Sequence, residues 1–140
     1  MAGMAGPHIA IVDDEASVRE ALGRMLTLSG FTIEIFSSGE EFLGAPLRPG
    51  QPDCVVLDYH MPVVSGLDVL RQLGLSGLGI PAIIITGHDR PDVFEQCLSA
   101  GAVACISKPL ERALLVDTIE AALRARTPGN PRPQATGNVK

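Results

Sequence analysis

Short apolar runs alternate with amphipathic segments along most of this chain. Residues 8–12, 54–57 and 82–85 are almost continuously apolar, which is typical of strands buried on both faces of a parallel sheet. Residues 31–36 alternate apolar with polar positions, so they predict a strand at the sheet edge with one partly wet face. A fifth strand is predicted at residues 102–106.

Five helices are predicted between and after these strands, because apolar residues there recur at intervals of three and four. Glycines, prolines and candidate capping residues mark the helix ends. Strands that alternate with helices predict an α/β fold, an open five-stranded parallel sheet with right-handed crossovers and helices on both faces. The predicted helices span residues 16–29, 39–43, 67–75, 92–100 and 110–126.

The composition indicates one globular domain. The chain has 140 residues, of which 46% are hydrophobic, so it has enough apolar mass for a core but no room for a second domain. We expect residues 1–7 to form a flexible leader and residues 8–126 to form the folded domain. Residues 127–140 are expected to be a disordered tail or linker.

Charge and cysteine spacing exclude several function classes. The net charge of -5 and the pI of about 5.1 argue against direct nucleic-acid binding, which needs a basic face. No apolar stretch approaches the length of a membrane span and no secretory signal is recognisable, so we expect a cytosolic protein with no membrane partner. Cys54, Cys97 and Cys105 form no CxxC pair, so we interpret them as small buried side chains.

Polar side chains follow the carboxyl ends of several predicted strands. Asp13 and Asp14 follow the first strand, and Asp58 ends the third. Thr86 comes at the end of the fourth strand, and Lys108 follows the fifth. Because these strand ends meet at one edge of a parallel sheet, we expect the five side chains to converge there.

This set of residue types favours phosphoryl chemistry. Three carboxylates held close together repel one another unless a cation neutralises them, and hard oxygen ligands suit a hydrated Mg²⁺. The sequence therefore predicts a magnesium site at Asp13, Asp14 and Asp58. With Lys108 as a positive point charge and Thr86 as a hydroxyl donor, the cluster suits a phosphoryl group on its way to Asp58.

Each of these residues also has a simpler interpretation when it is taken alone. Asp58 could cap the following turn, and Asp14 could be the N-cap of the next helix. Lys108 could be a solvated surface lysine, and Thr86 could bond its own loop. Their joint occurrence at the ends of different strands is what favours a reactive site.

Four motifs make the chain resemble two-component response-regulator receiver domains, of the chemotaxis-receiver and FixJ type. They are Val-Asp-Asp-Glu at residues 12–15, Leu-Asp-Tyr-His-Met-Pro at 57–62, Ile-Thr-Gly-His at 85–88 and Ser-Lys-Pro-Leu at 107–110. The similarity covers residues 8–126 with all motifs in order, which is more specific than any one short pattern. It implies a flavodoxin-like sheet with strand order 2-1-3-4-5.

The resemblance implies a signalling role and not an enzyme. A sensor histidine kinase or a phosphotransfer protein would transfer a phosphoryl group to Asp58, and the change would alter a face that binds a downstream protein or an output domain. It also implies that Asp14, Asp58 and the backbone carbonyl of His60 bind Mg²⁺ directly. Asp13 would act on the ion largely through water.

The family further implies that Thr86 and Lys108 contact the phosphoryl oxygens. Movement of Thr86 would then repack the face formed by the fourth helix, the fifth strand and the fifth helix. The sequence departs from the family at Cys105, where a receiver usually places the switch aromatic. His60 and His88 stand where side chains tune water access in the family, or they are ordinary solvated loop histidines.

Two other function classes stay open at this point. A receiver fold that no longer switches could be a constitutive interaction module, an alternative raised by Cys105. A Mg²⁺ phosphohydrolase could also form an aspartyl phosphate in passing. Enzymes that resemble the dehalogenase-like phosphatases carry a second Asp two residues after the nucleophile, where this chain has His60.

Overall fold

The computed structural model of this protein describes residues 6–45, 51–87 and 91–125. Within them, five strands form one sheet in the order β2-β1-β3-β4-β5, and each pair of neighbours is parallel. This is the sheet and the strand order that we expected. The strands are β1 (His8–Val12), β2 (Thr32–Phe36), β3 (Cys54–Asp58), β4 (Ala82–Thr86) and β5 (Ala104–Ser107).

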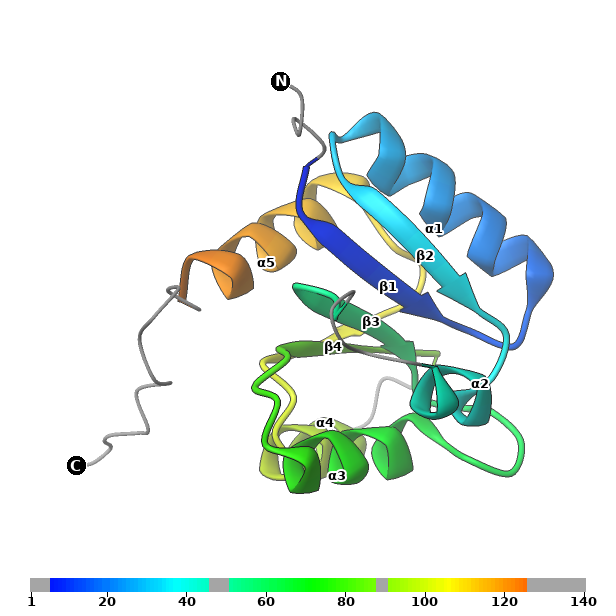
Figure 1. The fold of residues 1–140 in the computed structure, drawn as a ribbon, viewed down its shortest axis with the longest axis vertical. Helices are drawn as coiled ribbons and strands as arrows, with labels where there is room; N and C mark the ends of the chain where they lie inside the picture. The colour runs from blue at the N-terminus through cyan, green and yellow to red at the C-terminus, as the bar shows by residue number, and fades with distance from the viewer. Residues whose placement is uncertain (1–5, 46–50, 88–90, 126–140) are drawn as a thin grey trace.

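Helices cover both faces of the sheet, as Figure 1 shows. Helices α1 and α5 lie on one face, and α2, α3 and α4 lie on the other. A parallel sheet needs this double cover because each crossover between strands carries a helix across one of its faces. The helices are α1 (Ala16–Leu28), α2 (Gly39–Gly44), α3 (Gly66–Ser76), α4 (Pro91–Ser99) and α5 (Arg112–Ala125).

The central strands send alternate side chains into two separate cores. All five residues of β3 and all five of β4 are buried, as their continuous apolar composition predicts. Val55 and Leu57 of β3 point to the core under α2, α3 and α4, whereas Val56 points to the core under α1 and α5. The edge strand β2 is less buried, and Ile35 is exposed.

Several element ends differ from the prediction for local reasons. Helix α3 begins one residue early because Ser65 and Asp68 form a capping box, each side chain accepting from the other's backbone N–H. The helix continues to Ser76, one residue beyond the prediction, and Gly77 in a left-handed conformation ends it. Strand β5 begins only at Ala104.

Helix α1 corrects one of the simpler interpretations. Its N-cap is Glu15, and no side chain caps it, so Asp14 is not the N-cap. Asp13 does accept a hydrogen bond from the backbone N–H of Glu15 at 2.9 Å. The aspartate pair is therefore not explained by helix capping.

Some predictions concern residues outside the described ranges. They are the state of residues 1–5, the tail at residues 127–140, and the role of His88. In the part of the chain that the structure describes, no helix is long and apolar enough to cross a membrane.

Candidate functional site

Three aspartates converge at the carboxyl ends of β1 and β3. The two strands are neighbours, and Val12 is paired with Leu57, so the residues that follow them emerge side by side. One carboxylate oxygen from each of Asp13, Asp14 and Asp58 lies within 4.8 Å of the others. Asp13 and Asp58 are only 1% and 5% exposed, whereas Asp14 is exposed.

Lys108 and Thr86 reach the same edge from the two following strands. Thr86 is fully buried at the end of β4, and its carbonyl oxygen accepts a hydrogen bond from the Lys108 backbone N–H at 2.8 Å. The Lys108 Nζ atom lies 3.4 Å from Asp58 Oδ1. This lysine is thus paired with the buried carboxylate, and the peptide bond to Pro109 is cis.

Burial and mutual charge make the acidic cluster electrostatically unfavourable. The pKa of Asp58 is raised to about 6, mainly by burial and also by the charge of Asp13, while Lys108 lowers it. Burial also raises the pKa of Asp13, against the hydrogen bond from the Glu15 backbone. A divalent cation with a preference for oxygen ligands would relieve this repulsion, so the donor set fits Mg²⁺.

The connection from β3 to α3 holds Asp58 in place by backbone contacts. The Tyr59 N–H donates to the Ile85 carbonyl at 2.8 Å, and the Tyr59 carbonyl accepts from the Gly66 N–H at 3.0 Å. A β-carbon at Gly66 would overlap the Asp58 carbonyl oxygen and lie 3.0 Å from Tyr59 Cα. Gly66 is therefore required by the close approach of α3 to the strand end.

A strained turn lies in the middle of this connection. The Val64 N–H donates to the Pro62 carbonyl at 2.8 Å, and Val63 between them has a φ of 68°. This is a γ-turn with a β-branched residue in the left-handed region, an uncommon conformation. Val63 is 83% exposed, so burial of its side chain does not compensate the strain.

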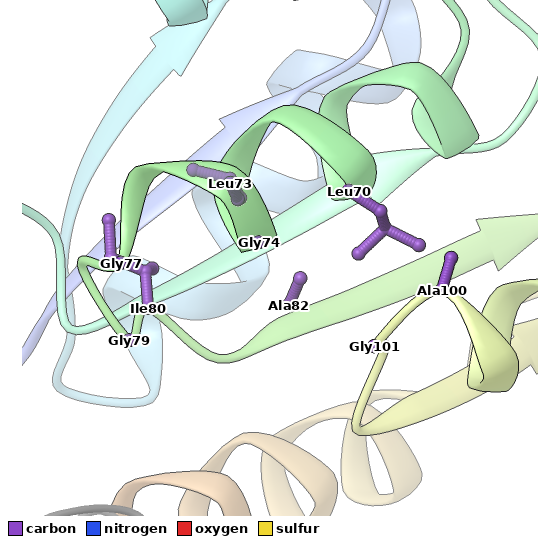
Figure 2. A pocket seen from close by; sticks show the side chains of 9 residues that line it. All are labelled: Leu70, Leu73, Gly74, Gly77, Gly79, Ile80, Ala82, Ala100 and Gly101. Carbon is purple, nitrogen blue, oxygen red and sulfur yellow. The ribbon is translucent and has the colours of Figure 1, made fainter.

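The site opens to solvent as a hollow of about 270 Å³, which Asp14, Asp58, Lys108 and the exposed His60 help to line. A second hollow of about 260 Å³ lies at the opposite end of the sheet, where β4 begins. Figure 2 shows glycines and aliphatic side chains around it. No charged residue lines this second hollow, so it does not share the chemistry of the first.

Sequence reasoning missed two contacts of the site. The Arg19 Nη1 atom donates to the Asp13 carbonyl at 2.8 Å. The Tyr59 hydroxyl donates to Gln96 Oε1 of α4 at 3.3 Å. The first contact goes to a backbone carbonyl and the second joins residues 37 positions apart, so no local pattern predicts them.

Cys105 is a residue of β5, and its side chain lies beside Cys97 of α4. The pKa of Cys105 is raised to about 12, mainly by burial and also by Cys97, and burial raises the pKa of Cys97. The two thiols share a hydrogen bond and stay neutral. Cys54 and Cys97 are buried as expected, but Cys105 is half-buried.

The chain is similar to response regulators over most of its length. It is 42% identical over 116 residues to the transcriptional regulatory protein FixJ of Rhizobium meliloti, covering 81% of this chain and 55% of FixJ. It is 40% identical over 116 residues to the response regulator protein TodT of Pseudomonas putida, covering 83% and 51%. The chain thus spans about half the length of the curated relatives it matches.

Solved structures agree with this similarity. The crystal structure of FixJ-N matches with a TM-score of 0.80 and 38% identity, covering 89% of this chain and 98% of FixJ-N. The chemotaxis protein CheY4 of Vibrio cholerae has a TM-score of 0.78 at 24% identity, covering 85% of this chain and 100% of CheY4, and shows the fold alone. Residues 9–120 match the response regulator receiver domain family. The chain therefore belongs to the receiver domains of two-component response regulators.

Proposed function

We propose that this domain accepts a phosphoryl group on Asp58 from a sensor histidine kinase or a phosphotransfer protein. The observation that carries the proposal is one buried carboxylate with two others within 4.8 Å and an ammonium group at 3.4 Å. A structural ion pair would need neither the second nor the third acid. In this role the domain is a signalling phosphoacceptor and not an enzyme with a separate substrate.

The proposed transfer uses the Asp58 carboxylate as the nucleophile. One of its oxygens forms a bond to phosphorus while the bond from phosphorus to the donor's imidazole nitrogen breaks. Lys108, already 3.4 Å from Asp58, would stabilise the charge on the phosphoryl oxygens. Thr86, at the end of the neighbouring strand, would offer its hydroxyl to the same oxygens.

Mg²⁺ is the proposed cofactor. Asp14, Asp58 and the backbone carbonyl of His60 would bind the ion directly, and Asp13 would act largely through water. The raised pKa values of Asp13 and Asp58 support the proposal, because they indicate negative charge that lacks compensation. When bound, Mg²⁺ supplies positive charge that favours the approach of an anionic phosphoryl group.

We infer that phosphorylation changes the face formed by α4, β5 and α5, through Thr86 and Cys105. The receiver would be the segment at residues 8–126, followed by a tail or linker. Relatives such as FixJ are about twice as long as the matched region, so the output would come from another segment or from a separate protein.

Labelling with phosphate tests the proposal. Incubation with acetyl phosphate or a phosphorylated histidine kinase should give one label per chain that requires Mg²⁺, survives acid and is lost in base. Asp58→Asn should abolish the label, and Asp117→Asn, at an exposed carboxylate of α5, should keep it. A label that persists in Asp58→Asn contradicts the proposal.

The second candidate function is a constitutive interaction module. It is favoured by Cys105, a small thiol at the position where family members have a switch aromatic. Beryllofluoride with Mg²⁺ distinguishes the two functions. Chemical-shift changes in α4 and α5 support the switch, and changes confined to the acidic cluster support the constitutive module.

A further inference from the structure

Arg19 contacts the acidic loop from the side of α1. Its Nη1 atom donates to the carbonyl oxygen of Asp13 at 2.8 Å, in a half-buried position. That oxygen belongs to the peptide unit that joins Asp13 to Asp14, the two adjacent acids of the cluster. Arg19 therefore holds the one backbone group that both acids share.

Holding this peptide unit restrains the direction of both carboxylates. A peptide unit is planar, so fixing its oxygen limits the ψ angle of Asp13 and the φ angle of Asp14. Two further bonds restrain the same loop: the Asp13 N–H donates to the Phe36 carbonyl at 3.2 Å, and Asp13 Oδ1 accepts from the Glu15 N–H at 2.9 Å. Asp14 lacks such a bond among those the structure shows, so the Arg19 contact is the tie nearest to it.

The geometry also separates Arg19 from Lys108. The ammonium group of Lys108 faces a carboxylate, whereas the guanidinium of Arg19 donates to a neutral carbonyl. A cation that faces a ligand carboxylate competes with a metal ion, but one that binds the backbone behind the ligands does not. Arg19 can therefore order the loop while the carboxylate oxygens stay available.

We propose that Arg19 is a positioning residue of the cation site, which holds the Asp13–Asp14 peptide so that both carboxylates face Asp58. The inference rests on the proposed Mg²⁺ binding. The proposal predicts that loss of Arg19 changes the Mg²⁺ affinity in the direction opposite to a simple charge effect. Removing a nearby positive charge should tighten Mg²⁺ binding by electrostatics alone, whereas removing a positioning contact should weaken it.

A Mg²⁺ titration of the full chain shows whether the variant binds Mg²⁺ more weakly or more tightly than the wild type. Tyr59 is the only tyrosine in a chain without tryptophan, and it follows Asp58 directly, so its fluorescence can report the binding. Arg19→Met keeps an unbranched apolar stem but removes both the charge and the hydrogen-bond donor. We expect the dissociation constant for Mg²⁺ to rise about tenfold. Arg24→Met removes an equal charge from the same helix, and we expect an unchanged or slightly lower constant.

Conservative variants keep the test decisive if Arg19→Met fails to fold. Arg19→Lys retains the charge but not the planar donor group, and Arg24→Lys is its control. An affinity reduced at least twofold in Arg19→Lys alone supports the proposal. Equal or tighter Mg²⁺ binding in the Arg19 variants, with thermal unfolding of the Mg²⁺-free protein little changed, overturns it.

The experiment also separates this inference from the proposed function. If the wild-type chain shows no Mg²⁺ binding, or binding that Asp14→Asn does not weaken, the magnesium site itself is wrong and both proposals are contradicted. If the wild type binds Mg²⁺ through Asp14 and only the Arg19 result is negative, the phosphoacceptor function stands and Arg19 is an ordinary helix residue.

Discussion

The two ends of the sheet differ in what they bury. At the carboxyl end, Asp13, Asp58 and Thr86 are buried, and they are the buried polar side chains found among the described residues. At the amino end of β4, the hollow in Figure 2 is lined by glycines and by aliphatic residues such as Leu73 and Ile80. The carboxyl end is thus crowded and charged, whereas this hollow at the amino end of β4 is lined by uncharged residues and is only partly filled.

This difference shows which part of the fold contains interactions that lower its stability. Burial of like charges and a close backbone approach are unfavourable by themselves, and they occur together only at the carboxyl end. The hollow at the amino end of β4 has neither feature, because no charged residue lines it and a β-carbon at Gly74 would have no neighbour within 4 Å. Substitutions at the two ends should therefore change stability in opposite directions, and helix α3, which has a glycine at each end of the sheet, permits a direct comparison.

Gly66→Ala should have the largest effect. The new methyl group would overlap the Asp58 carbonyl oxygen and approach Tyr59 Cα, and neither is the end of a flexible side chain. We expect the free energy of unfolding to fall by about 3 kcal/mol, together with weaker phosphate labelling of Asp58. Urea denaturation measures the first effect, and wild-type stability in this variant would show that the close contact is not required.

Asp58→Asn should stabilise the Mg²⁺-free protein. Folding raises the pKa of Asp58 from 3.8 to about 6, so its ionised form is disfavoured in the fold. The contribution of Asp58 to the free energy of unfolding is therefore fully present at low pH, where the side chain is protonated, and is lost as the pH rises through about 6. Asparagine does not ionise, so the variant does not lose this contribution. We expect its free energy of unfolding to exceed that of the wild type by about 2 kcal/mol at pH 7.5 and by much less at pH 4.

Urea denaturation of both chains across this pH range isolates the contribution of Asp58. Other carboxyl groups titrate too, and hydrogen bonds from Ser37 lower the pKa of Glu41, but these groups are common to both chains. A difference in unfolding free energy that does not change with pH would contradict the assigned burial cost.

Gly74→Ala, at the other end of α3, should have the smallest effect and the opposite sign to Gly66→Ala. A β-carbon at Gly74 has no neighbour within 4 Å, and alanine favours a helix over glycine by about 1 kcal/mol. We expect a gain in unfolding free energy of up to that amount, with phosphate labelling unchanged. A destabilised variant would mean that the hollow beside Gly74 is needed.

The sequence predicted the parts of the fold that depend on local patterns. The bounds of β3 at Cys54–Asp58 follow from an unbroken apolar run that ends in one carboxylate. The meeting of Asp58 with Asp13 and Lys108 follows from parallel topology, because strand ends at one edge are neighbours. The start of β5 was less accurate, since Val103 is exposed although its apolar character suggested a buried strand residue.

The missed features depend on contacts with the backbone, which leave no mark in the pattern of side chains. The partner of Arg19 is the Asp13 carbonyl oxygen, and because every residue has a backbone carbonyl, the sequence cannot indicate which one is bound. Gly66 was only a helix-start signal, whereas its close contact with Asp58 depends on how near α3 approaches β3. Such distances are set by packing of the whole domain, which no short window of residues encodes.

The γ-turn at Val63 has two opposing consequences. A β-branched side chain at a φ of 68° costs about 1–3 kcal/mol, and glycine or asparagine would relieve that cost in one step. The relief would also widen the conformations open to the connection that carries His60, one end of which is fixed against Asp58 by Gly66. At this position, the stability of the domain and the order of the acidic site therefore make opposite demands on the residue.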